Sequence, residues 1–550
     1  MTTYWGNAVL APCQSKNSAA VRIDPHHLRL KDMGRRSMPV RVASALLLAA
    51  VVHAAAPEPN EPVRLETEPL RRPHRTREMT VPDHLEHRSG RSRTNLRQRK
   101  VAFTNADAAL VSVSQDLSEY IQATLADTGI PSISIALMKD DEIVWQQAFG
   151  NSNATLQVPA TSDTVYAVAS CFKPVTAMAV MQLIDKGLVQ LDDPVNKHLG
   201  EHGIKDLSEA GKPVTIRHIL SHYSGLSVST QLVPLWERKL PKTMEEHVAE
   251  LKPVRDPGVK YEYSNSGYTV AGLLVEKVTG QTFEQYVAEN ILKPAGCKTR
   301  GPVHPTPEML EQLARPYKIV NRKPVPEVPY RLDVVPAGDI YLTVPDLARI
   351  LIPHINEGLS GTTRLLSKSS LQDMRTPQFG GKDGLDFGIR KTDRELFVMH
   401  GGGVPGYSSK ILLATRSGYG VCIASNAGDQ QLVVNTTACL AMDLLRGKGA
   451  GGELTQKVVH VGINFRQDKD TGLLRIGTVF PNSPASGAGL SVGTLIRKIN
   501  QTSVKGKSLG ECLALMKGPQ GTALTFELFE PIQDITREVV LKKQEFLAPA

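Results

Sequence analysis

The sequence predicts an α+β fold in which helices flank an antiparallel sheet, with a helical region inserted between its strands and a small β-rich domain after it. Strand-like runs occur near both ends of residues 108–446, and the stretch between them is mainly helical in period. A sheet must then be assembled from both ends of this unit. A second set of short strands begins beyond a glycine-rich joint, and 550 residues are enough for two or three folded units.

The beginning of the chain has the layout of an export leader. A basic segment, 35–41, precedes an apolar run, 42–52, and the small residues of 53–56. This order is typical of a secretory signal, and the apolar run is too short to span a bilayer. We therefore expect residues 1–56 to be a signal-peptide-like leader of an exported, periplasmic or secreted protein, with no integral membrane segment in the mature chain. An uncleaved, alanine-rich buried helix is the alternative.

The positive charge is concentrated ahead of the folded part. Residues 1–100 hold 18 Lys and Arg against 9 Asp and Glu, and the remaining chain holds 46 of each, so the net charge of +9 belongs to the N-terminal arm. Residues 57–107, basic and rich in Pro and Arg, are expected to form a disordered linker. A formally neutral body gives no reason to expect nucleic-acid binding.

The order of elements follows from periodicity and turn residues. Within the unit 108–446 we expect a helix at 108–127, a hairpin of 133–138 with 142–149, a helix from Ser170 to about Lys186 that ends at Gly187, helices at 267–279 and 283–292, an irregular section to about 333, strands at 397–399, 409–414 and 420–424, and a closing helix at 436–446. After a linker at 447–457, residues 458–550 are expected to contain strands at 458–466, 473–479, 495–499, 523–528 and 538–542 and a helix at 509–516.

Neither a metal nor another cofactor is expected. His218 and His222 have a spacing that could ligate a metal, but the Glu of a zinc-protease helix is missing between them. The glycines from Gly401 to Gly406 match a dinucleotide pattern, but a strand-like run follows where a helix is needed. The cysteines are scattered, which favours buried free thiols over a disulfide framework; they are Cys13, Cys171, Cys297, Cys422, Cys439 and Cys512.

Two motifs supply residues suited to nucleophilic catalysis. Ser170 and Lys173 are three residues apart, so on a helix they share a face and the amine can take the hydroxyl proton. In the segment Tyr263-Ser264-Asn265, a cationic lysine nearby is expected to lower the pKa of the tyrosine, and the asparagine can hold a substrate amide. A half-buried turn tyrosine and an ordinary helix N-cap are the alternatives for this segment.

A third motif begins at His400 and continues as Gly401-Gly402-Gly403. Glycines there let a substrate approach a strand edge, where a backbone N–H can be donated to an oxyanion.

In this order, the three motifs resemble those of the serine β-lactamase and penicillin-binding-protein family, especially its class C and esterase-like branch. The resemblance covers about residues 115–445 and implies structural roles for His218 and His222. Other segments that look like family segments are 164–166, 191–195, 215–222, 224–226, 336–343 and 346–349.

The resemblance implies a hydrolase that works through an acyl-enzyme. The implied roles are nucleophile for Ser170, a shared base role for Lys173 and Tyr263, substrate binding for Asn265, His400 and Gly402, and an oxyanion hole from the N–H groups of Ser170 and Gly403. The expected substrate is a small ester, a peptide or a cell-wall-derived compound.

Two departures from the family pattern affect the expected substrate. Cys171 and Phe172 are bulkier than the usual residues between the serine and the lysine, and are expected to reshape the pocket floor. His400 stands where a lysine is usual, and a histidine is mostly neutral above about pH 6.5. This argues for an esterase, or a peptidase of the D-amino-acid or peptidoglycan-stem type. A β-lactamase proper and a non-catalytic peptide-binding scaffold are the alternatives.

Residues 458–550 resemble a PDZ domain of the bacterial type. Gly462-Ile463-Asn464-Phe465 looks like its carboxylate-binding loop and first strand. Segments 483–485, 488–490 and 493–496 also match, although Thr494 replaces the usual Asp. The resemblance implies that this domain binds the C-terminus of a peptide or protein by strand addition. A packing or dimerisation unit is the alternative.

Overall fold

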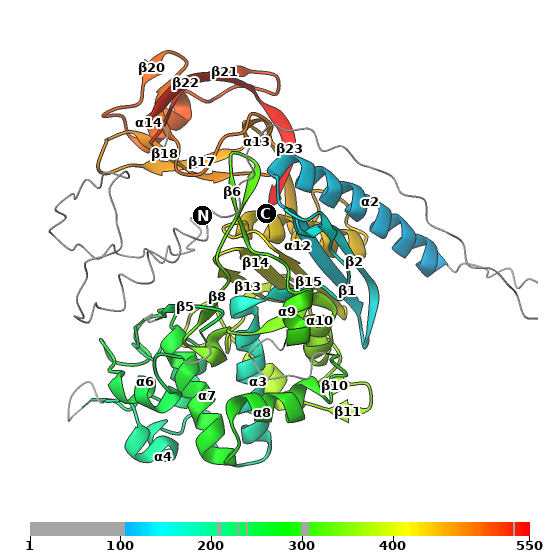
Figure 1. The fold of residues 1–550 in the computed structure, drawn as a ribbon, viewed down its shortest axis with the longest axis vertical. Coiled ribbons are helices and arrows are strands. Elements are labelled where there is room, and N and C mark those ends of the chain that lie inside the picture. Colours follow the sequence, from blue (N-terminus) through cyan, green and yellow to red (C-terminus); the bar gives the residue numbers. More distant parts are fainter. Residues whose placement is uncertain (1–104, 206–210, 228–229, 238–239, 299–306, 532–533) are drawn as a thin grey trace, which may run out of the picture. The chain divides into compact units, whose positions relative to one another are not determined.

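A computed structural model describes residues 105–550, except for 206–210, 228–229, 238–239, 299–306 and 532–533 (Figure 1). The expected leader, nearly all of the expected linker and Cys13 lie outside the described residues. The other five cysteines are free and buried, as predicted. Within the described part of the chain, none of the helices is both long enough and apolar enough to cross a bilayer.

The central sheet is antiparallel throughout and joins the two ends of the first folded unit. Its strand order is β12-β13-β14-β15-β1-β2-β3. The strands are β1 (Ser132–Lys139), β2 (Glu142–Asn153), β3 (Val158–Pro159), β12 (Gly388–Lys391), β13 (Leu396–Val404), β14 (Tyr407–Ala414) and β15 (Tyr419–Ser425). Because β1 pairs with β15, the prediction of a sheet assembled from both ends is confirmed.

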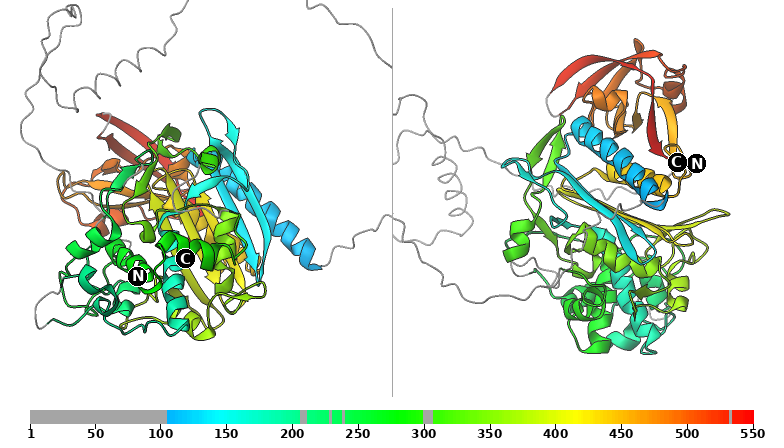
Figure 2. Two further views of the ribbon diagram at one scale, coloured as in Figure 1. Left: turned by 60° about the horizontal axis from the view of Figure 1, so that its bottom comes forward. Right: turned by 90° about the vertical axis from the view of Figure 1, so that its right-hand side faces the viewer.

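Helices cover both faces of this sheet (Figures 1 and 2). On β15, Val421 and Ile423 pack in the core shared with α2 (Asn105–Thr128) and α12 (Gln431–Leu445), whereas the alternate residue Cys422 packs in the core of the opposite face. This alternation is the period-two pattern of a strand buried on both sides.

The region between β3 and β12 packs against the second face and carries α3 (Lys173–Asp185), which is buried almost all round. Before α7 it also contains β4 (Val165–Ala167), η1 (Ala169–Phe172), α4 (Asn196–Leu199), η2 (Gly200–His202), α5 (Ile216–Leu220), β5 (Leu232–Pro234) and α6 (Met244–Glu250). From α7 onward it contains α7 (Asn265–Thr279), α8 (Phe283–Val287), η3 (Ala288–Leu292), α9 (Pro307–Gln312), β6 (Tyr317–Val320), β7 (Lys323–Pro326), β8 (Tyr330–Leu332), η4 (Val335–Ala337), β9 (Tyr341–Thr343), α10 (Val344–Leu351), η5 (Ile352–His354), β10 (Leu359–Ser360), β11 (Thr363–Arg364) and α11 (Lys368–Met374).

The section expected to be irregular up to residue 333 is partly regular. It contains α9 and the hairpin β6–β7, in which Tyr317 pairs with Pro326. Asn321 and Arg322 both have positive φ and make the two-residue turn. The prediction was wrong here because prolines in β7 and a turn without glycine hide the usual hairpin signal.

The C-terminal residues form a β-rich domain with a core of its own. Its elements are β16 (Thr455–His460), β17 (Ile463–Gln467), β18 (Leu474–Val479), α13 (Pro484–Gly487), β19 (Leu495–Ile499), β20 (Thr502–Ser503), α14 (Leu509–Ala514), β21 (Ala523–Glu530), β22 (Ile535–Lys542) and β23 (Gln544–Pro549). The single strand expected at 458–466 is two strands, because the left-handed Gly462 (φ 86°) separates β16, which pairs with β23, from β17, which pairs with β18.

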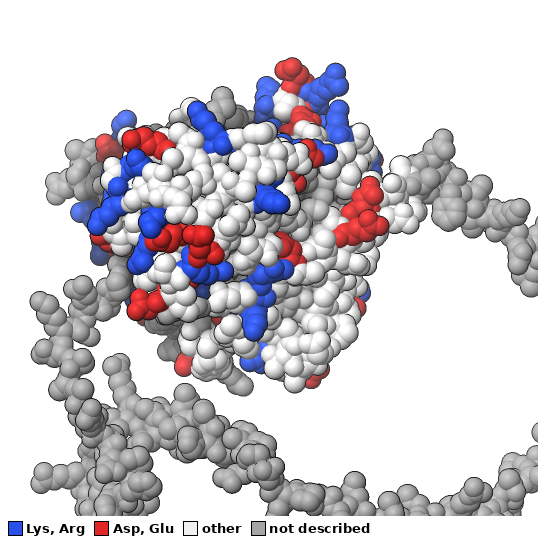
Figure 3. All heavy atoms as spheres, turned by 90° about the horizontal axis from the view of Figure 1, so that it is seen from above, with Lys and Arg blue, Asp and Glu red and all other residues white. Residues whose placement is uncertain are grey.

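Charged side chains of both signs are interspersed on the face shown in Figure 3. This distribution is what a body with equal numbers of acidic and basic residues outside the N-terminal arm leads one to expect.

Candidate active site

Ser170 lies in a strained turn immediately before α3, and not within the α-helix that the sequence predicted. The turn is the 3₁₀ segment η1, and Ala169 within it has a φ of 49°. This backbone conformation costs about 1–3 kcal/mol for a residue other than glycine, so contacts with the surrounding structure must hold the turn in place. Here Val168 provides the anchor, because its carbonyl accepts from Ser409 Oγ at 2.7 Å and from Cys171 N at 3.2 Å.

Two glycines allow the neighbouring segments to close on this turn. A Cβ on Gly402 would lie 2.3 Å from the carbonyl oxygen of Val168, and a Cβ on Gly338 would lie 2.6 Å from the carbonyl carbon of Ala169. Both positions therefore need glycine. Gly402 was expected to face the substrate, but the structure places it, buried, against the turn that carries Ser170.

Lys173 is the base nearest to the candidate nucleophile. Its Nζ lies 2.8 Å from Ser170 Oγ and donates to the carbonyl of Ala337 at 2.6 Å. The side chain is fully buried, and burial lowers the pKa of Lys173 to about 7, against the charge of Asp386, which acts to raise it. An amine with this pKa is neutral in a large fraction of molecules at pH 7 and can take the serine proton.

Tyr263 lies beside the same lysine but does not ionise as the sequence suggested. Its ring centroid is 4.9 Å from Lys173 Nζ, and it forms a hydrogen bond with Ser170. Burial and the charge of Asp386 raise the pKa of Tyr263 well above its usual value, and the hydrogen bond offsets only part of this. The expected lowering is wrong, because desolvation of the phenol outweighs the neighbouring cation. The phenol stays protonated and is a proton donor, so the base role falls on Lys173.

Asn265 has a buried acceptor atom without a hydrogen-bond partner among the described residues. It is the first residue of α7, and the N-cap is Ser264, whose hydroxyl accepts from Gly267 N. Asn265 Nδ2 donates to Thr230 Oγ1 at 2.7 Å. Its Oδ1 is buried and has no partner among the described residues. An unsatisfied buried acceptor is costly, and a substrate N–H would satisfy it.

Gly403 presents a backbone N–H on the open side of β13. Val404 and Tyr407 flank a two-residue turn, so alternation along the ladder directs the Gly403 N–H away from β14. On that side, β12 accompanies β13 only as far as Met399 in the ladder that the structure describes. Together with the N–H of Ser170, this group is suited to binding an oxyanion.

His400 carries a charge that the sequence did not predict. Its Nε2 lies 3.5 Å from Asp386 Oδ1, and its Nδ1 lies 2.7 Å from the carbonyl oxygen of Gly401. Burial acts to lower the pKa of His400, but the charge and hydrogen bond of Asp386, with a smaller contribution from Cys171, raise it to about 9. The expectation of a mostly neutral His400 is therefore wrong.

Asp386 is the residue that sequence reasoning missed, and it also contacts His222, whose Nε2 is 3.1 Å from the same Oδ1. Asp386 is 14 residues from His400 and 164 from His222, and it stands in no motif, so spacing offered no signal. The carbonyl of Ala337 was also missed, although it lies in the family-like segment 336–343.

The two histidines that had metal-like spacing have separate structural contacts. The His218 ring accepts from Thr215 N at 3.1 Å and stacks on Phe379 with ring centroids 4.8 Å apart. His222 Nδ1 accepts from Ser264 N at 3.1 Å. Each imidazole thus accepts from the backbone N–H of a helix N-cap residue, Thr215 before α5 and Ser264 before α7.

The bulky residues between Ser170 and Lys173 do not form the pocket floor that was expected. Cys171 and Phe172 are completely buried. Phe172 packs edge-on against Phe283, with ring centroids 6.4 Å apart, and Cys171 Sγ lies 3.2 Å from Ser409 Oγ. They fill the core beneath the turn because the 3₁₀ geometry points them inward.

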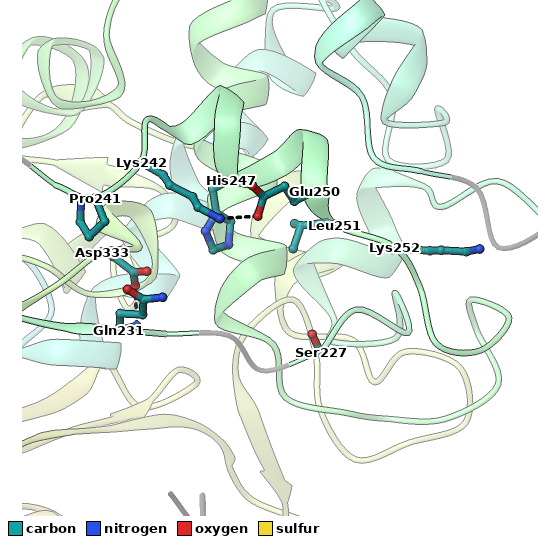
Figure 4. A pocket seen from close by; sticks show the side chains of 9 residues that line it. All are labelled: Ser227, Gln231, Pro241, Lys242, His247, Glu250, Leu251, Lys252 and Asp333. Carbon is teal, nitrogen blue, oxygen red and sulfur yellow. Dashed lines mark hydrogen bonds and ion pairs between the residues drawn. The ribbon is translucent and has the colours of Figure 1, made fainter. Parts of the chain in front are cut away.

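A cavity of about 300 Å³ lies beside α6 (Figure 4). Ser227 separates this cavity from the N-cap of α7. Ser264 Oγ donates to the carbonyl of Ser227, which belongs to the cavity wall. Within the wall, Lys242 pairs with Glu250, and Gln231 N donates to Asp333. Neither Ser170 nor Lys173 lines this cavity, so it is not the catalytic centre.

Comparison with known proteins identifies a family for this part of the chain. A sequence model of the Beta-lactamase family matches residues 117–438. Protein flp of Staphylococcus aureus (strain MW2) is 24% identical over 337 residues, which are 58% of this chain and 64% of that protein, so the chain spans less than two thirds of this relative.

Two solved structures share the fold. The octameric penicillin-binding protein homologue from Pyrococcus abyssi aligns with a TM-score of 0.52 and 23% identity, covering 80% of this chain and 98% of its own. EstCE1, a hydrolase with promiscuous acyltransferase activity, aligns with a TM-score of 0.51 and 18% identity, covering 62% of this chain and 99% of its own. At these identities the likeness concerns the fold alone.

Proposed function

The chain belongs to the Beta-lactamase family, and on that premise we propose that it is an exported serine hydrolase that cleaves an ester or amide through an acyl-enzyme on Ser170. The observation that carries this proposal is the contact between Lys173 Nζ and Ser170 Oγ, 2.8 Å long and formed by a fully buried amine. A buried lysine with a pKa near 7 matches what activation of a serine hydroxyl requires.

The proposed reaction has two halves. Lys173 takes the proton of Ser170 as Oγ attacks the substrate carbonyl, and the N–H groups of Ser170 and Gly403 bind the oxyanion. The bond to the leaving group then breaks, and the leaving oxygen or nitrogen receives a proton from the Tyr263 hydroxyl, which is reprotonated from Lys173. Water attacks the acyl-serine ester in the second half, which releases the acid and restores Ser170.

Asn265 and His400 support binding of a peptide-like substrate in this proposal. The unpartnered Oδ1 of Asn265 can accept an amide N–H, and His400 supplies a positive charge nearby. A substrate of the esterase or D-amino-acid peptidase type, including a peptidoglycan stem, fits these two groups. The same charge also favours a β-lactam carboxylate, so a β-lactamase proper is the second candidate.

The experiment compares Ser170→Ala with the wild type on a chromogenic ester, a D-alanyl-D-alanine peptide and a chromogenic cephalosporin. Ser369→Ala, at an exposed serine, is the matched control. We expect turnover of the ester or the peptide and a mass increase of one acyl group in quenched wild-type and Ser369→Ala protein, both lost in Ser170→Ala. Turnover that persists in Ser170→Ala would contradict the role of Ser170 as nucleophile. No acyl transfer from any of the three substrates would favour a non-catalytic scaffold.

For the C-terminal domain, we propose binding of a peptide or protein C-terminus beside β17. This strand is at the edge of its sheet, and α14 begins next to its far end, where Gln467 Nε2 donates to Lys507 O at 2.6 Å. Leu509 and Leu513 of α14 are 41% and 47% exposed, and they offer apolar contacts to an added strand. Gly462 precedes β17, in the place of a carboxylate-binding loop.

Peptide binding and export are tested separately. Immobilised peptides with a free carboxylate should bind the full chain more tightly than the same peptides as carboxamides, and equal binding would contradict the role of a carboxylate loop. For export, residues 1–60 fused to a reporter enzyme that acts only outside the cytoplasm should deliver activity. Loss of reporter activity on replacing Leu47 and Leu48 by Arg would show that export depends on the apolar run, whereas an inactive wild-type fusion would contradict the leader.

A further inference from the structure

A buried carboxylate next to the candidate active site, that of Asp386, contacts two histidines through one oxygen. Its Oδ1 lies 3.1 Å from His222 Nε2 and 3.5 Å from His400 Nε2, and its Oδ2 is buried without a partner among the described residues. The side chain has no solvent exposure, and the backbone has a φ of 67°, which is strained for a residue other than glycine. Such a carboxylate needs a positive partner.

The hydrogen-bond partners identify which histidine carries the charge. His222 Nδ1 accepts from Ser264 N, so this nitrogen has no proton and His222 is a neutral donor through Nε2. His400 differs, because its Nδ1 faces the carbonyl of Gly401 at 2.7 Å and its Nε2 faces the carboxylate of Asp386. Carbonyls and carboxylates only accept hydrogen bonds, so both nitrogens of His400 carry protons.

Other groups around the carboxylate do not replace this charge. Lys173 of α3 is uncharged in a large fraction of molecules near pH 7, since its pKa is about 7. Desolvation and the charge of Asp386 raise the pKa values of three nearby tyrosines, so these side chains stay neutral; they are Tyr261, Tyr263 and Tyr268. Asp383 adds a second carboxylate that favours a charged His400, and Cys171 contributes in the same direction. His400 is the histidine whose pKa is raised, whereas that of His222 is lowered.

We propose that Asp386 is a positioning residue that holds His400 as an imidazolium, with neutral His222 fixing the carboxylate from its other side, so that the site selects substrates with a carboxylate near the scissile bond. The selection rests on the proposed acyl transfer at Ser170. His400 is 8% exposed, and its ring centroid is 6.2 Å from that of Tyr263, so its charge lies beside the catalytic residues. In a partly desolvated site, a fixed charge attracts a substrate anion far more than it would in water.

The test uses two matched esters that differ in one group on the leaving side, a free carboxylate or a carboxamide. In the wild type, the ratio of their kcat/KM values should favour the acid at pH 7.5 and fall as the pH rises through about 9, because His400 then loses its proton. In Asp386→Asn, the ratio at pH 7.5 should fall at least 10-fold, mainly through KM, and the descending limb should move to about pH 6.5 or below. Asp393→Asn, at an exposed aspartate, is the matched control and should keep the wild-type ratio.

A rescue distinguishes positioning of a charge from general structural support. The double variant Asp386→Asn with His400→Lys should recover the preference for the acid, because an ammonium group does not need Asp386 to remain charged. An unchanged ratio and limb in Asp386→Asn, or a double variant that stays unselective while folded, would overturn the proposal.

A direct measurement keeps the inference testable if Asp386→Asn does not fold or no turnover is found. Nitrogen-15 histidine spectra of the full wild-type chain, assigned with His400→Gln and His222→Gln, should show both His400 nitrogens protonated at pH 7.5 and a neutral His222. A neutral His400 would overturn the inference even if Ser170 proves catalytic. A charged His400 without Ser170-dependent hydrolysis would support the inference and contradict only the proposed function.

Discussion

The candidate active site around Ser170 and the β17 edge of the C-terminal domain are two candidate recognition surfaces built in opposite ways. In the candidate active site, the side chains of Lys173, Asp386 and His400 are at least nine-tenths buried, so their charges act at low effective dielectric and shift one another's protonation. At the β17 edge, recognition would depend on backbone groups and on exposed leucines of α14.

This difference predicts unequal sensitivity to substitution. In the candidate active site, one protonation change alters the neighbouring buried groups, whereas single side chains at an exposed edge contribute small and nearly independent amounts. The five predictions below test this contrast, from the largest expected effect to the smallest.

Lys173→Met should lower kcat/KM for any turned-over ester by about 10³-fold or more, because the buried amine is the base next to Ser170. Removing a buried charge should at the same time leave the chain folded. Steady-state kinetics and urea unfolding check the two parts. Lys498→Met, at a half-exposed lysine of the C-terminal domain, is the control and should retain activity. Full activity in Lys173→Met would contradict the base role of this buried amine.

The pH dependence of kcat/KM for a neutral ester should show the titration of Lys173. Because the lysine must be neutral to accept a proton, kcat/KM should fall about 10-fold for each unit below a midpoint near pH 7, and reach a plateau above it. A neutral ester removes the contribution of the His400 charge from this limb. A flat profile between pH 5.5 and 8 would contradict the assignment of Lys173 as the base.

Asp443→Ala should lower the free energy of unfolding by about 3–5 kcal/mol, because it leaves several buried donors without an acceptor, at about 1–3 kcal/mol each. Asp443, at the end of α12, accepts from the backbone N–H groups of Glu453, Leu454 and Thr455 and from the Thr455 hydroxyl. It fixes the segment leading into β16, which the sequence predicted as a linker. Urea unfolding measures the loss, and Asp443→Asn should recover part of it. A loss below 1 kcal/mol would indicate that this segment is a free joint.

Leu513→Asp should weaken binding of a C-terminal peptide about 10-fold, because it puts a carboxylate where an apolar contact with a negatively charged peptide end is proposed. Ester turnover should not change. Val492→Asp, at another exposed apolar residue of the same domain, is the matched control. Fluorescence anisotropy with a labelled peptide measures both, and equal weakening by the two variants would indicate a general charge effect.

Lys498→Met should change the free energy of unfolding by less than about 0.5 kcal/mol. The ion pair of Lys498 with Glu527, 2.7 Å long, is partly exposed, and solvent screens it. Urea unfolding in low and high salt measures the effect. A loss above 2 kcal/mol would show that charges in this domain are as strongly coupled as those in the candidate active site.

Local patterns in the sequence predicted most of the fold. The hairpin of β1 and β2 and the strands β13 to β15 have the expected period, and the pairing of β1 with β15 follows from the need to bury both. The hairpin β6–β7 was missed because its turn residues, Asn321 and Arg322, are not the ones that usually signal a two-residue turn.

The candidate site was predicted as a set of residues but not in its protonation. Of the predicted residues, Ser170, Lys173 and Tyr263 contact one another, and the His400 ring lies beside Tyr263. The pKa direction expected for Tyr263 and the charge expected for His400 were both wrong, because each depends on burial and on Asp386. A protonation state is a property of the surroundings in space, and a linear motif contains only part of them.

The sequence by itself determined which chemistry is available: a serine and a lysine three residues apart, a tyrosine with an asparagine, and a histidine followed by glycines. Residue type and spacing are fixed by the covalent chain, and helix and strand geometry keeps the members of each motif close together in space. Only the tertiary structure decided how that chemistry is charged. It brings Asp386 between two histidines from distant segments and removes all three from water, where the energy of a charge depends on partners that no sequence interval records.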